Sequence, residues 1–557
     1  MALLFIDGGD EYARWVYEHE RRGYWATAFP LMLEKHGHLC YVRGDVELLQ
    51  QPERWPDYDV VLVARLPDSA WTERAIRAAV EGSTPVVVEA PAPSAILESF
   101  GISASGGGVD DGSLVCTDPD LGTLARNTYG VAAGGPVTRP AWIRVSRMPE
   151  MDWQARPAVP LDRVQAASWR APGWAVQHWA LDGDSKLDIL AQWQTWGTSV
   201  RRPAVVRRGN LHLFALGVFG FLGQAHTAEP SDGAEHRGAP RVSGVEAFVL
   251  SLIDSIYARS GLDRIRLLPW PDGVTWVRTV RHDFDRALTA DQVAKVLSDH
   301  ARVGSSATWY WRAEPRRRAA RTSWYSADLR PAALVAATPS HEVALHTELL
   351  WSQADVERGV LEAAIMRPVR GTTAHGAPNC FRYQGAPNIL WAEQQAMLYT
   401  EFLNHSHLHP HHCALLTPSG EIRVSAVLCL PNHLSFDAST TASNRQAVEQ
   451  GLNVFVRTRG LAQIMNHPDV NQADLFDCLA AMPADGRADW TAAEAAQWWL
   501  ATHSSRALTV RREDSRTFAV IAATSLQSVQ FEISRPDGSL ALTAVDLPSK
   551  AQVRVAA

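Results

Sequence analysis

The sequence has few cysteines and no long apolar run. Its six cysteines include no CxxC spacing, a pattern that favours reduced thiols over a disulfide framework. Nowhere do about 18 apolar residues follow one another, so we expect no membrane-spanning helix. The stretch from Met1 to Tyr12 lacks basic residues and soon turns acidic, so no signal peptide is predicted. These absences together predict a cytoplasmic protein.

Basic residues do not outnumber acidic ones in this sequence. The formal net charge is −7, which argues against a nucleic-acid partner because the phosphate backbone calls for a basic surface. A chain of 557 residues is too long for one hydrophobic core, and its 46% hydrophobic content can fill several. We therefore expect three or four domains, whereas the composition says nothing about oligomeric state.

The first part of the chain alternates short apolar strands with amphipathic helices. The expected strands are Leu3–Ile6, His38–Val42, Asp59–Ala64 and Pro85–Glu89, and the expected helices are Trp15–Leu33 and Ala70–Glu81. A hairpin over Pro203–Arg207 and Asn210–Gly217 and a helix over Gly244–Ser260 close this unit. Alternation of this kind predicts an α/β domain with a parallel, doubly wound sheet over residues 1–262.

This N-terminal arrangement resembles the flavodoxin-like fold of class I glutamine amidotransferase-type domains. Members of that group need a nucleophilic cysteine on a sharp strand-to-helix turn. Here the strand VVLVA runs into Arg65, Leu66 and Pro67 with no cysteine nearby. The resemblance therefore implies a domain without catalytic activity.

The last fifty residues alternate apolar and polar side chains strongly. The expected strands are Leu508–Arg511, Phe518–Ala523, Val529–Ile533, Leu540–Val545 and one around Val553, with Pro536-Asp537-Gly538 in a turn. Period-two alternation with such turns predicts a small antiparallel β-domain, a β-sandwich-like accessory unit, over residues 504–557.

Chemistry-bearing residues follow three strands of the central region. The apolar strand beginning at Val277 ends in Asp283 and Asp285, and extended geometry would point both carboxylates to one side. Two later strands end in His346 and His375. Each residue alone is more often structural. Three successive strand ends offering Asp, His and His favour a divalent-metal site with an open position for hydrolysis.

At this point the motifs RHDFDR, HEVALHT, RGTTAHG and Asn466-His467-Pro468 resemble those of the polysaccharide-deacetylase superfamily, also called the NodB-homology or carbohydrate esterase family four group. The resemblance covers roughly Val277 to Pro483. It implies a distorted (β/α) barrel, which we assign to residues 263–503 as the catalytic domain.

The resemblance also implies a metal site. Asp285 and His346 match two ligands of the family. The common second histidine of the second motif is replaced by Leu350, and in the most similar branch that ligand comes from the next strand, which selects His375. The implied cofactor is Zn²⁺, with Co²⁺, Ni²⁺ or Mn²⁺ as alternatives.

The remaining family roles fall on three residues. Asp283 matches the general base, Arg370 the arginine that holds that base, and His467 the acid that protonates the leaving amine. We also expect weak substrate contacts from Trp309, Trp311 and Tyr383. Alternatively, the two tryptophans fill the core.

A run of histidines from Asn404 to His412 leaves two readings open. His405, His407 and His409 would share one face of a strand and form a second metal site, or the run is a polar loop or an active-site wall.

The function implied is removal of an N-acetyl or short acyl group from a carbohydrate or acylated amino sugar by metal-activated water. Two alternatives remain: a degenerate barrel that binds carbohydrate or serves as a scaffold, and a metal-dependent hydrolase of a non-sugar amide in a biosynthetic pathway.

Overall fold

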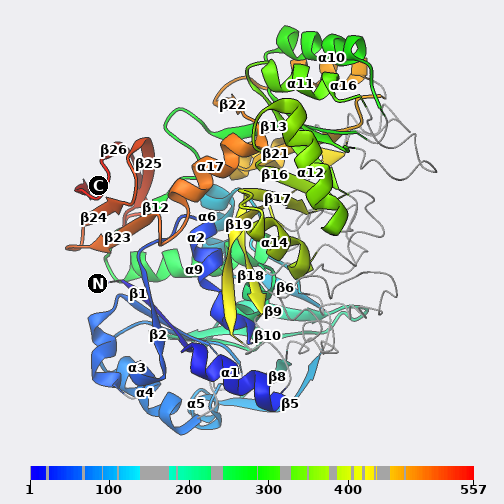
Figure 1. Cartoon of the computed structure of the whole chain (residues 1–557). Helices are drawn as coiled ribbons and strands as arrows, with labels where there is room; N and C mark the ends of the chain where they lie inside the picture. The colour runs from blue at the N-terminus through cyan, green and yellow to red at the C-terminus, as the bar shows by residue number, and fades with distance from the viewer. Residues whose placement is uncertain are drawn as a thin grey trace.

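The structure is a computed structural model of the whole chain. It describes residues 2–20, 24–49, 51–64, 69–90, 92–109, 112–137, 175–182, 186–226, 243–284, 287–313, 328–347, 351–374, 385–402, 407–416, 421–431, 434–435, 452–469 and 472–556. These residues form a mixed α/β protein with several sheets (Figure 1).

The N-terminal region is built on a nine-stranded sheet. In spatial order its strands are β2 (Tyr41–Asp45), β1 (Leu3–Gly8), β3 (Val60–Val63), β4 (Val86–Val88), β11 (Leu211–Phe214), β10 (Arg201–Arg208), β9 (Asp188–Thr195), β6 (Gly112–Cys116) and β7 (Gly134–Val137). The first five pair in parallel, and the rest pair antiparallel. A separate pair joins β5 (Ile102–Val109) to β8 (Ala175–Leu181).

The central parallel strands β3 and β4 are apolar throughout, and β1 is apolar from Leu3 to Ile6, because both faces of the sheet are covered there. Leu3 and Phe5 of β1 belong to one buried cluster, and Leu4 and Ile6 belong to another. The first cluster includes helix α9 (Ser243–Arg259), and the second includes Ile76 of α4 (Ser69–Glu81). Burial on both faces removes the polar alternation that a half-exposed strand would show.

The hairpin and the closing helix are confirmed. β10 pairs antiparallel with β11, and α9 matches the helix expected over Gly244–Ser260. The single helix expected over Trp15–Leu33 was wrong. The chain instead forms α1 (Gly9–Glu20), the 3₁₀ turn η1 (Trp25–Ala28) and α2 (Pro30–Lys35). Pro30 opens α2 because a proline, which lacks an amide hydrogen, is tolerated at the first helical position but not inside a helix.

The central region is built on a ten-stranded sheet. Its spatial order is β18 (His411–Leu416), β19 (Ile422–Pro431), β17 (Tyr399–Phe402), β16 (Gly371–Ala374), β15 (His341–Thr347), β14 (Ala307–Trp311), β13 (Trp276–Asp283), β21 (Leu461–Asn466) and β20 (Leu434–Ser435), with β22 (Arg487–Asp489) beside β13. All of these pair in parallel except β18 with β19.

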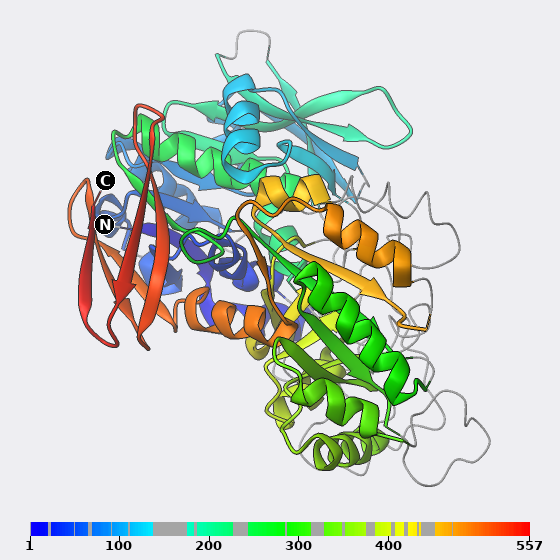
Figure 2. The ribbon, with the colours of Figure 1, turned by 90° about the horizontal axis from the view of Figure 1, so that it is seen from above.

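Helices cover both faces of this sheet. We call the face that packs against α17 (Ala492–Thr502) the inner face; Tyr310 and Tyr399 lie there with Trp499. The outer face packs against α10 (Ala290–Val303), α11 (Arg330–Ala337) and α12 (Trp351–Ile365), which form a layer in Figure 2. The remaining described helices are α3 (Val46–Leu49), η2 (Pro52–Asp57), α5 (Ser94–Ser99), α6 (Pro119–Tyr129), α8 (Val218–Gln224), α14 (Gly385–Gln394) and α16 (Gln472–Ala481).

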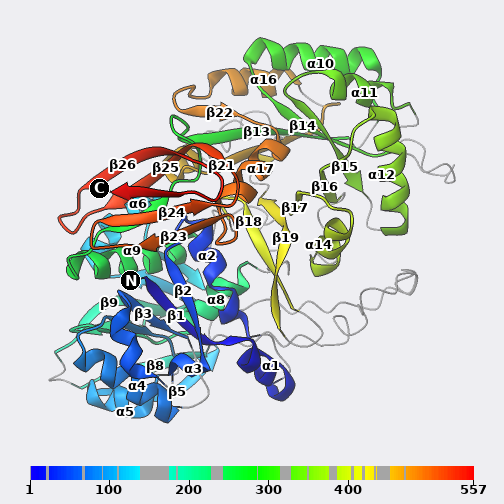
Figure 3. The same cartoon turned by 60° about the vertical axis from the view of Figure 1, so that its left-hand side comes forward.

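The C-terminal residues form two small antiparallel sheets, as their alternation predicted. One joins β23 (Leu508–Arg512), β24 (Thr517–Ala522) and β27 (Gln552–Ala556); the other joins β12 (Arg264–Leu267), β25 (Leu526–Ser534) and β26 (Leu540–Leu547). They lie beside the N-terminal sheet, on the side where both chain ends are found (Figure 3). Because β12 precedes the central sheet in the chain, this pairing ties the C-terminal residues to a segment far from them in sequence.

Two absences were expected from the sequence. Within the described residues, no helix is both long and apolar enough to cross a membrane. The five cysteines that the structure describes form no disulfide bond with one another.

Candidate functional site

A chain of buried polar side chains runs along the inner face of the central sheet. At its centre, Arg281 donates from Nε and Nη2 to the two oxygens of Asp283, at 2.6 Å each. The third guanidinium nitrogen, Nη1, donates to Glu401 Oε2 at 2.7 Å. All three residues are buried. One cation therefore holds two carboxylates, and its planar fork fixes the orientation of Asp283.

The chain continues from Glu401 towards the amino ends of the strands. Tyr310 and Gln463 donate to Glu401 Oε1, and the hydroxyl of Tyr310 lies 3.4 Å from that of Tyr399. Tyr399 in turn donates to Glu342 Oε1 at 2.9 Å.

The far end of this chain is capped by a helix. The first two backbone amides of α17 lie there: Ala493 N–H donates to Glu342 Oε2 at 2.9 Å, and Ala492 N–H donates to the hydroxyl of Thr308. Thr308 also donates to Glu342 Oε2. A helix N-terminus favours a negative group, so α17 stabilises the ionised form of this carboxylate. We call the set Asp283, Arg281, Glu401, Tyr310, Tyr399 and Glu342 the inner polar chain.

Strand periodicity explains why these residues meet. Val277, Arg281 and Asp283 of β13 are separated by even numbers of residues, so all three side chains point to the inner face. Tyr310 of β14 pairs directly with Asp283, and Glu401 of β17 lies two residues after Tyr399 on the same face. The parallel strands thus bring their inner-face side chains to neighbouring positions.

Protonation differs along the inner polar chain. Burial raises the pKa of Asp283, but the charge and hydrogen bonds of Arg281 together with the charges of His346 and His467 outweigh it, so the net pKa lies below the ordinary value. Burial raises the pKa of Glu401 to about 7 against the opposing charge of Arg281. Burial likewise raises the pKa of Glu342 to about 7 despite its three hydrogen-bond donors. At neutral pH Asp283 is ionised, whereas Glu342 and Glu401 each hold a proton part of the time.

Three of the residues that the sequence singled out meet at one end of this chain. His346 is buried at the end of β15, and His467 is half-buried just after β21. Both imidazoles interact electrostatically with Asp283 and lower its pKa, after burial and Arg281 in order of size. Asp283, His346 and His467 thus lie together at the carboxyl ends of β13, β15 and β21, the edge of a parallel sheet where active sites gather.

The arginine at the site is a different one from the arginine that the motifs suggested. Arg370 precedes β16, and its side chain is exposed. The guanidinium bound to Asp283 belongs to Arg281, which lies in the same motif as Asp283. Sequence reasoning missed Arg281, although its spacing of two from Asp283 was a signal that the two side chains share a face.

The two tryptophans proposed as substrate contacts lie in the core. Trp309 and Trp311 are 0% exposed and pack on the outer face with Phe284, whose ring stacks on that of Trp311 at 3.8 Å between centroids. Neither ring reaches the surface in this structure, so neither can stack on a sugar. The alternative that they fill the core is the one observed. Tyr310 between them faces inward and is also buried, because helices cover both sides of β14.

Several proposed residues lie outside the described part of the chain. These are Asp285, His375, Tyr383, Leu350 and His405. Their roles remain predictions.

Comparison with known proteins adds distant structural likeness. No family model matches the chain, and no curated protein matches it. Among solved structures, a protein described as a polysaccharide deacetylase from Mycobacterium smegmatis is 19% identical, with 41% of this chain and 91% of that chain covered and a TM-score of 0.31.

Two further solved structures show the extent of the likeness. A polysaccharide deacetylase from Bacillus cereus is 10% identical, with 39% of this chain and 91% of that chain covered and a TM-score of 0.25. A protein described as ThuA-like from Bacteroides uniformis is 10% identical, with 46% of this chain and 91% of that chain covered and a TM-score of 0.28. Each match covers less than half of this chain.

Proposed function

We propose that the chain is a metal-dependent amide hydrolase that removes an N-acetyl or short acyl group from an amino sugar or related carbohydrate. The observation that carries this proposal is the meeting of Asp283, His346 and His467 at one sheet edge, with Asp283 held by Arg281. A fixed carboxylate beside two imidazoles is the set of groups that acid–base cleavage of an amide needs.

Asp283 acts as the general base. It is ionised at neutral pH, so it can accept a proton from an attacking water, and the fork of Arg281 holds both of its oxygens in place. His467 then donates a proton to the departing nitrogen. Its side chain, in the loop after β21, is only half-buried, so part of it is exposed to solvent.

His346, together with Asp285 and His375, would hold the divalent ion, with Zn²⁺ as the first choice. Two imidazoles and one carboxylate are a donor set that suits a catalytic zinc. Asp283 fits the role of base better than that of ligand, because Arg281 already engages both of its oxygens. When bound, such an ion polarises an acyl carbonyl and lowers the pKa of its water to about 7.

The finer architecture is part of this proposal. The five parallel N-terminal strands follow the order second, first, third, fourth, fifth, which supports a flavodoxin-like domain over residues 1–262. The run of parallel strands from β13 to β17 supports a distorted (β/α) barrel over residues 263–503, and the antiparallel pairing supports an accessory domain over 504–557. The N-terminal domain would be non-catalytic, because VVLVA leads into a segment without a cysteine.

One observation favours a second candidate. The two-pronged contact of Arg281 with Asp283 lowers the pKa of that carboxylate and so weakens it as a base. A carbohydrate-binding or scaffold protein with a degenerate site would tolerate such a weak base. A hydrolase of a non-sugar amide would use the same residues on a different substrate.

The test measures metal content and acid release together. We expect the protein purified without chelator to release acetate from N-acetylated sugars, and Asp283→Asn to lower kcat about 10²–10⁴-fold, the usual worth of a general base. His346→Ala should lose the metal ion held at this sheet edge and, with it, the activity. His19→Ala, which removes an exposed histidine on α1, is the matched control.

The outcomes separate the candidates. Unchanged turnover in Asp283→Asn would refute the proposed mechanism. Absence of turnover in the parent protein, with retained sugar binding, would favour the degenerate site. Release of acid from acyl amino compounds but not from sugars would favour the non-sugar hydrolase.

A further inference from the structure

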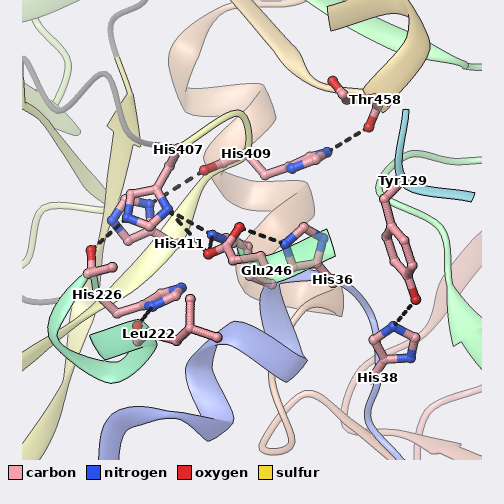
Figure 4. A network of polar contacts seen from close by, with 12 residues as sticks. His36, His38, Tyr129, Leu222, His226, Glu246, His407, His409, His411 and Thr458 are labelled. Carbon is pink, nitrogen blue, oxygen red and sulfur yellow. Dashed lines mark hydrogen bonds and ion pairs between the residues drawn. The ribbon is translucent and has the colours of Figure 1, made fainter. Parts of the chain in front are cut away.

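A second group of metal-binding side chains lies away from the inner polar chain, where the N-terminal and central regions meet. The histidines between His407 and His411 pack against three side chains from the N-terminal region (Figure 4). These are His36, which directly follows α2, His226, which lies just after α8, and Glu246 of α9. His226, His407 and His411 are all buried, with ring centroids 3.9 Å apart for His407 and His411 and 4.9 Å for His226 and His407.

In this cluster, Glu246 and His407 already contact a cationic side chain, that of Lys35. The ammonium of Lys35 donates to Glu246 Oε1 at 2.5 Å and to His407 Nδ1 at 2.7 Å. His36 contacts the other oxygen of Glu246 at 3.0 Å. His407 Nε2 donates to the carbonyl of Ala225, so its Nδ1 is the acceptor that Lys35 uses. The group His226, Glu246 and His407 could hold a metal ion by its geometry, but the ammonium of Lys35 satisfies its carboxylate.

Two imidazole nitrogens beside it have no hydrogen-bond partner. His226 Nδ1 donates to the carbonyl of Leu222 at 2.8 Å, so the lone pair lies on Nε2, which is buried and unpartnered. His411 Nδ1 lies 3.4 Å from the carbonyl of His409, and its Nε2 is likewise buried and unpartnered. Anchoring of one ring nitrogen by a backbone carbonyl, with the other left bare, is how metal-binding histidines are usually held.

Two buried thiols lie beside His411. One donor atom each from His411, Cys413 and Cys429 lie within 4.8 Å of one another, and all three residues are buried. His411 and Cys413 are two residues apart on β18, and Cys429 pairs with His411 across the ladder from β19. Strand geometry thus places three soft or borderline ligands at one point of the sheet.

A backbone hydrogen bond brings His226 to the same strand. The amide of Ala414 donates to the carbonyl oxygen of His226 at 2.7 Å, and Ala414 follows Cys413 directly. The rings of His226 and His411 lie perpendicular, with centroids 5.5 Å apart. His226 therefore offers a further nitrogen donor beside His411.

We propose that Cys413, Cys429, His411 and His226 bind one structural Zn²⁺ ion that fastens the end of α8 to β18. Two thiolates cancel the charge of the ion, which a buried site requires. Four protein ligands leave no open position, so the site is structural and not catalytic. Sulfur ligands select zinc over magnesium or manganese. The proposal does not depend on the proposed hydrolase, because none of its ligands belongs to the inner polar chain.

The first test uses the ligand chemistry to tell this ion from any other. X-ray absorption at the zinc edge of the parent protein should show a sulfur shell at about 2.3 Å, which the oxygen and nitrogen ligands Asp285, His346 and His375 cannot supply. The Co²⁺-substituted protein should show a sulfur-to-cobalt charge-transfer band. This band should persist in His346→Ala. A zinc-replete parent protein without a sulfur shell would overturn the proposal.

The second test uses matched cysteine variants. We expect Cys413→Ser and Cys429→Ser each to lose one equivalent of zinc and the charge-transfer band, and His226→Ala to bind the ion more weakly. Cys478→Ser is the control, because Cys478 is also buried but lies on α16. A charge-transfer band that survives in the Cys413→Ser, Cys429→Ser double variant would refute the site. If the variants fail to fold, the zinc-edge measurement on the parent protein decides.

Discussion

Glu342 should make the central sheet less stable as the pH rises. Its carboxyl is buried, and burial raises its pKa in the folded state to about 7, from an ordinary value of 4.5. Because the folded state holds this proton more tightly than the unfolded state, the stabilisation is present below the unfolded pKa and is lost as the pH rises through the folded pKa. At 1.36 kcal/mol per unit the full change is about 3 kcal/mol.

The variant Glu342→Gln removes this titration and keeps the shape. The amide oxygen can replace Oε2 as the acceptor for Ala493 N–H and the Thr308 hydroxyl, and the amide nitrogen can donate to the Tyr399 hydroxyl. We therefore expect the variant to gain about 2–3 kcal/mol on the parent protein between about pH 5 and about pH 8.5. Glu401 is coupled to Glu342, so the two carboxyls titrate together and the change spreads over this window.

Hydrogen exchange is the appropriate assay, because a chain with several sheets need not unfold in one step. Peptides from β13 and β15 of parent and variant are compared at the same pH, so intrinsic exchange rates cancel. The ratio of the protection factor in Glu342→Gln to that in the parent protein should rise roughly 50-fold between about pH 5 and about pH 8.5. Glu98→Gln on α5, which replaces an exposed carboxyl, should change nothing. Parallel curves for parent and Glu342→Gln would refute the argument.

Three further predictions concern buried ion pairs. Arg281→Met should destabilise the fold by about 3–5 kcal/mol, because it leaves buried carboxylates unpaired, whereas Arg370→Met at an exposed position should stay within about 0.5 kcal/mol; urea unfolding checks both. Lys35→Met likewise leaves the buried carboxylate of Glu246 without its ion-pair partner. It should lower the free energy of unfolding by about 3–5 kcal/mol, which would be measured as a lower Tm. Glu401→Gln should remove the step near pH 7 from the pH profile of kcat/KM, and an unchanged profile would contradict the inferred coupling to the base.

Local sequence patterns predicted many of the strands and helices of the fold. Strands β1, β3 and β4, the hairpin of β10 and β11 and the helix α9 lie where apolar periodicity placed them. Strand β2 begins at Tyr41, three residues after the expected start at His38, and β6, β7 and β9 were not predicted. Alternation also predicted the antiparallel pairing at the C-terminus. The break between α1 and α2 was missed because an amphipathic period continues through Trp15 to Leu33, and only Pro30 marks the restart.

Long-range contacts could not be read from the sequence. Glu401 meets Arg281 across 120 positions of sequence, and nothing in its local pattern shows this. The choice between core and cleft for Trp309 and Trp311 was undecidable because a strand covered on both faces carries no polar alternation.

The histidine run shows the same limit. The run was noted as a metal site or a polar loop, with His405, His407 and His409 as the shared face. Its partners in the structure are Lys35, 372 positions away from His407, and Cys429 on the neighbouring strand. Spacing within the run identified the metal-binding residue types but not which of them meet a partner.

The inner polar chain links the strength of the base to the protonation of a neighbour. Arg281 is shared between Asp283 and Glu401, and an ionised Glu401 also raises the pKa of Glu342 by like-charge repulsion. When Glu401 holds its proton, the charge of Arg281 falls on Asp283 alone and weakens it as a base. When Glu401 is ionised, it competes for the guanidinium and repels the charge on Asp283, which makes Asp283 a stronger base. Because the pKa of Glu401 lies at about 7, this change falls near neutral pH, so the basicity of Asp283 rises there with pH even though its own carboxyl is already ionised.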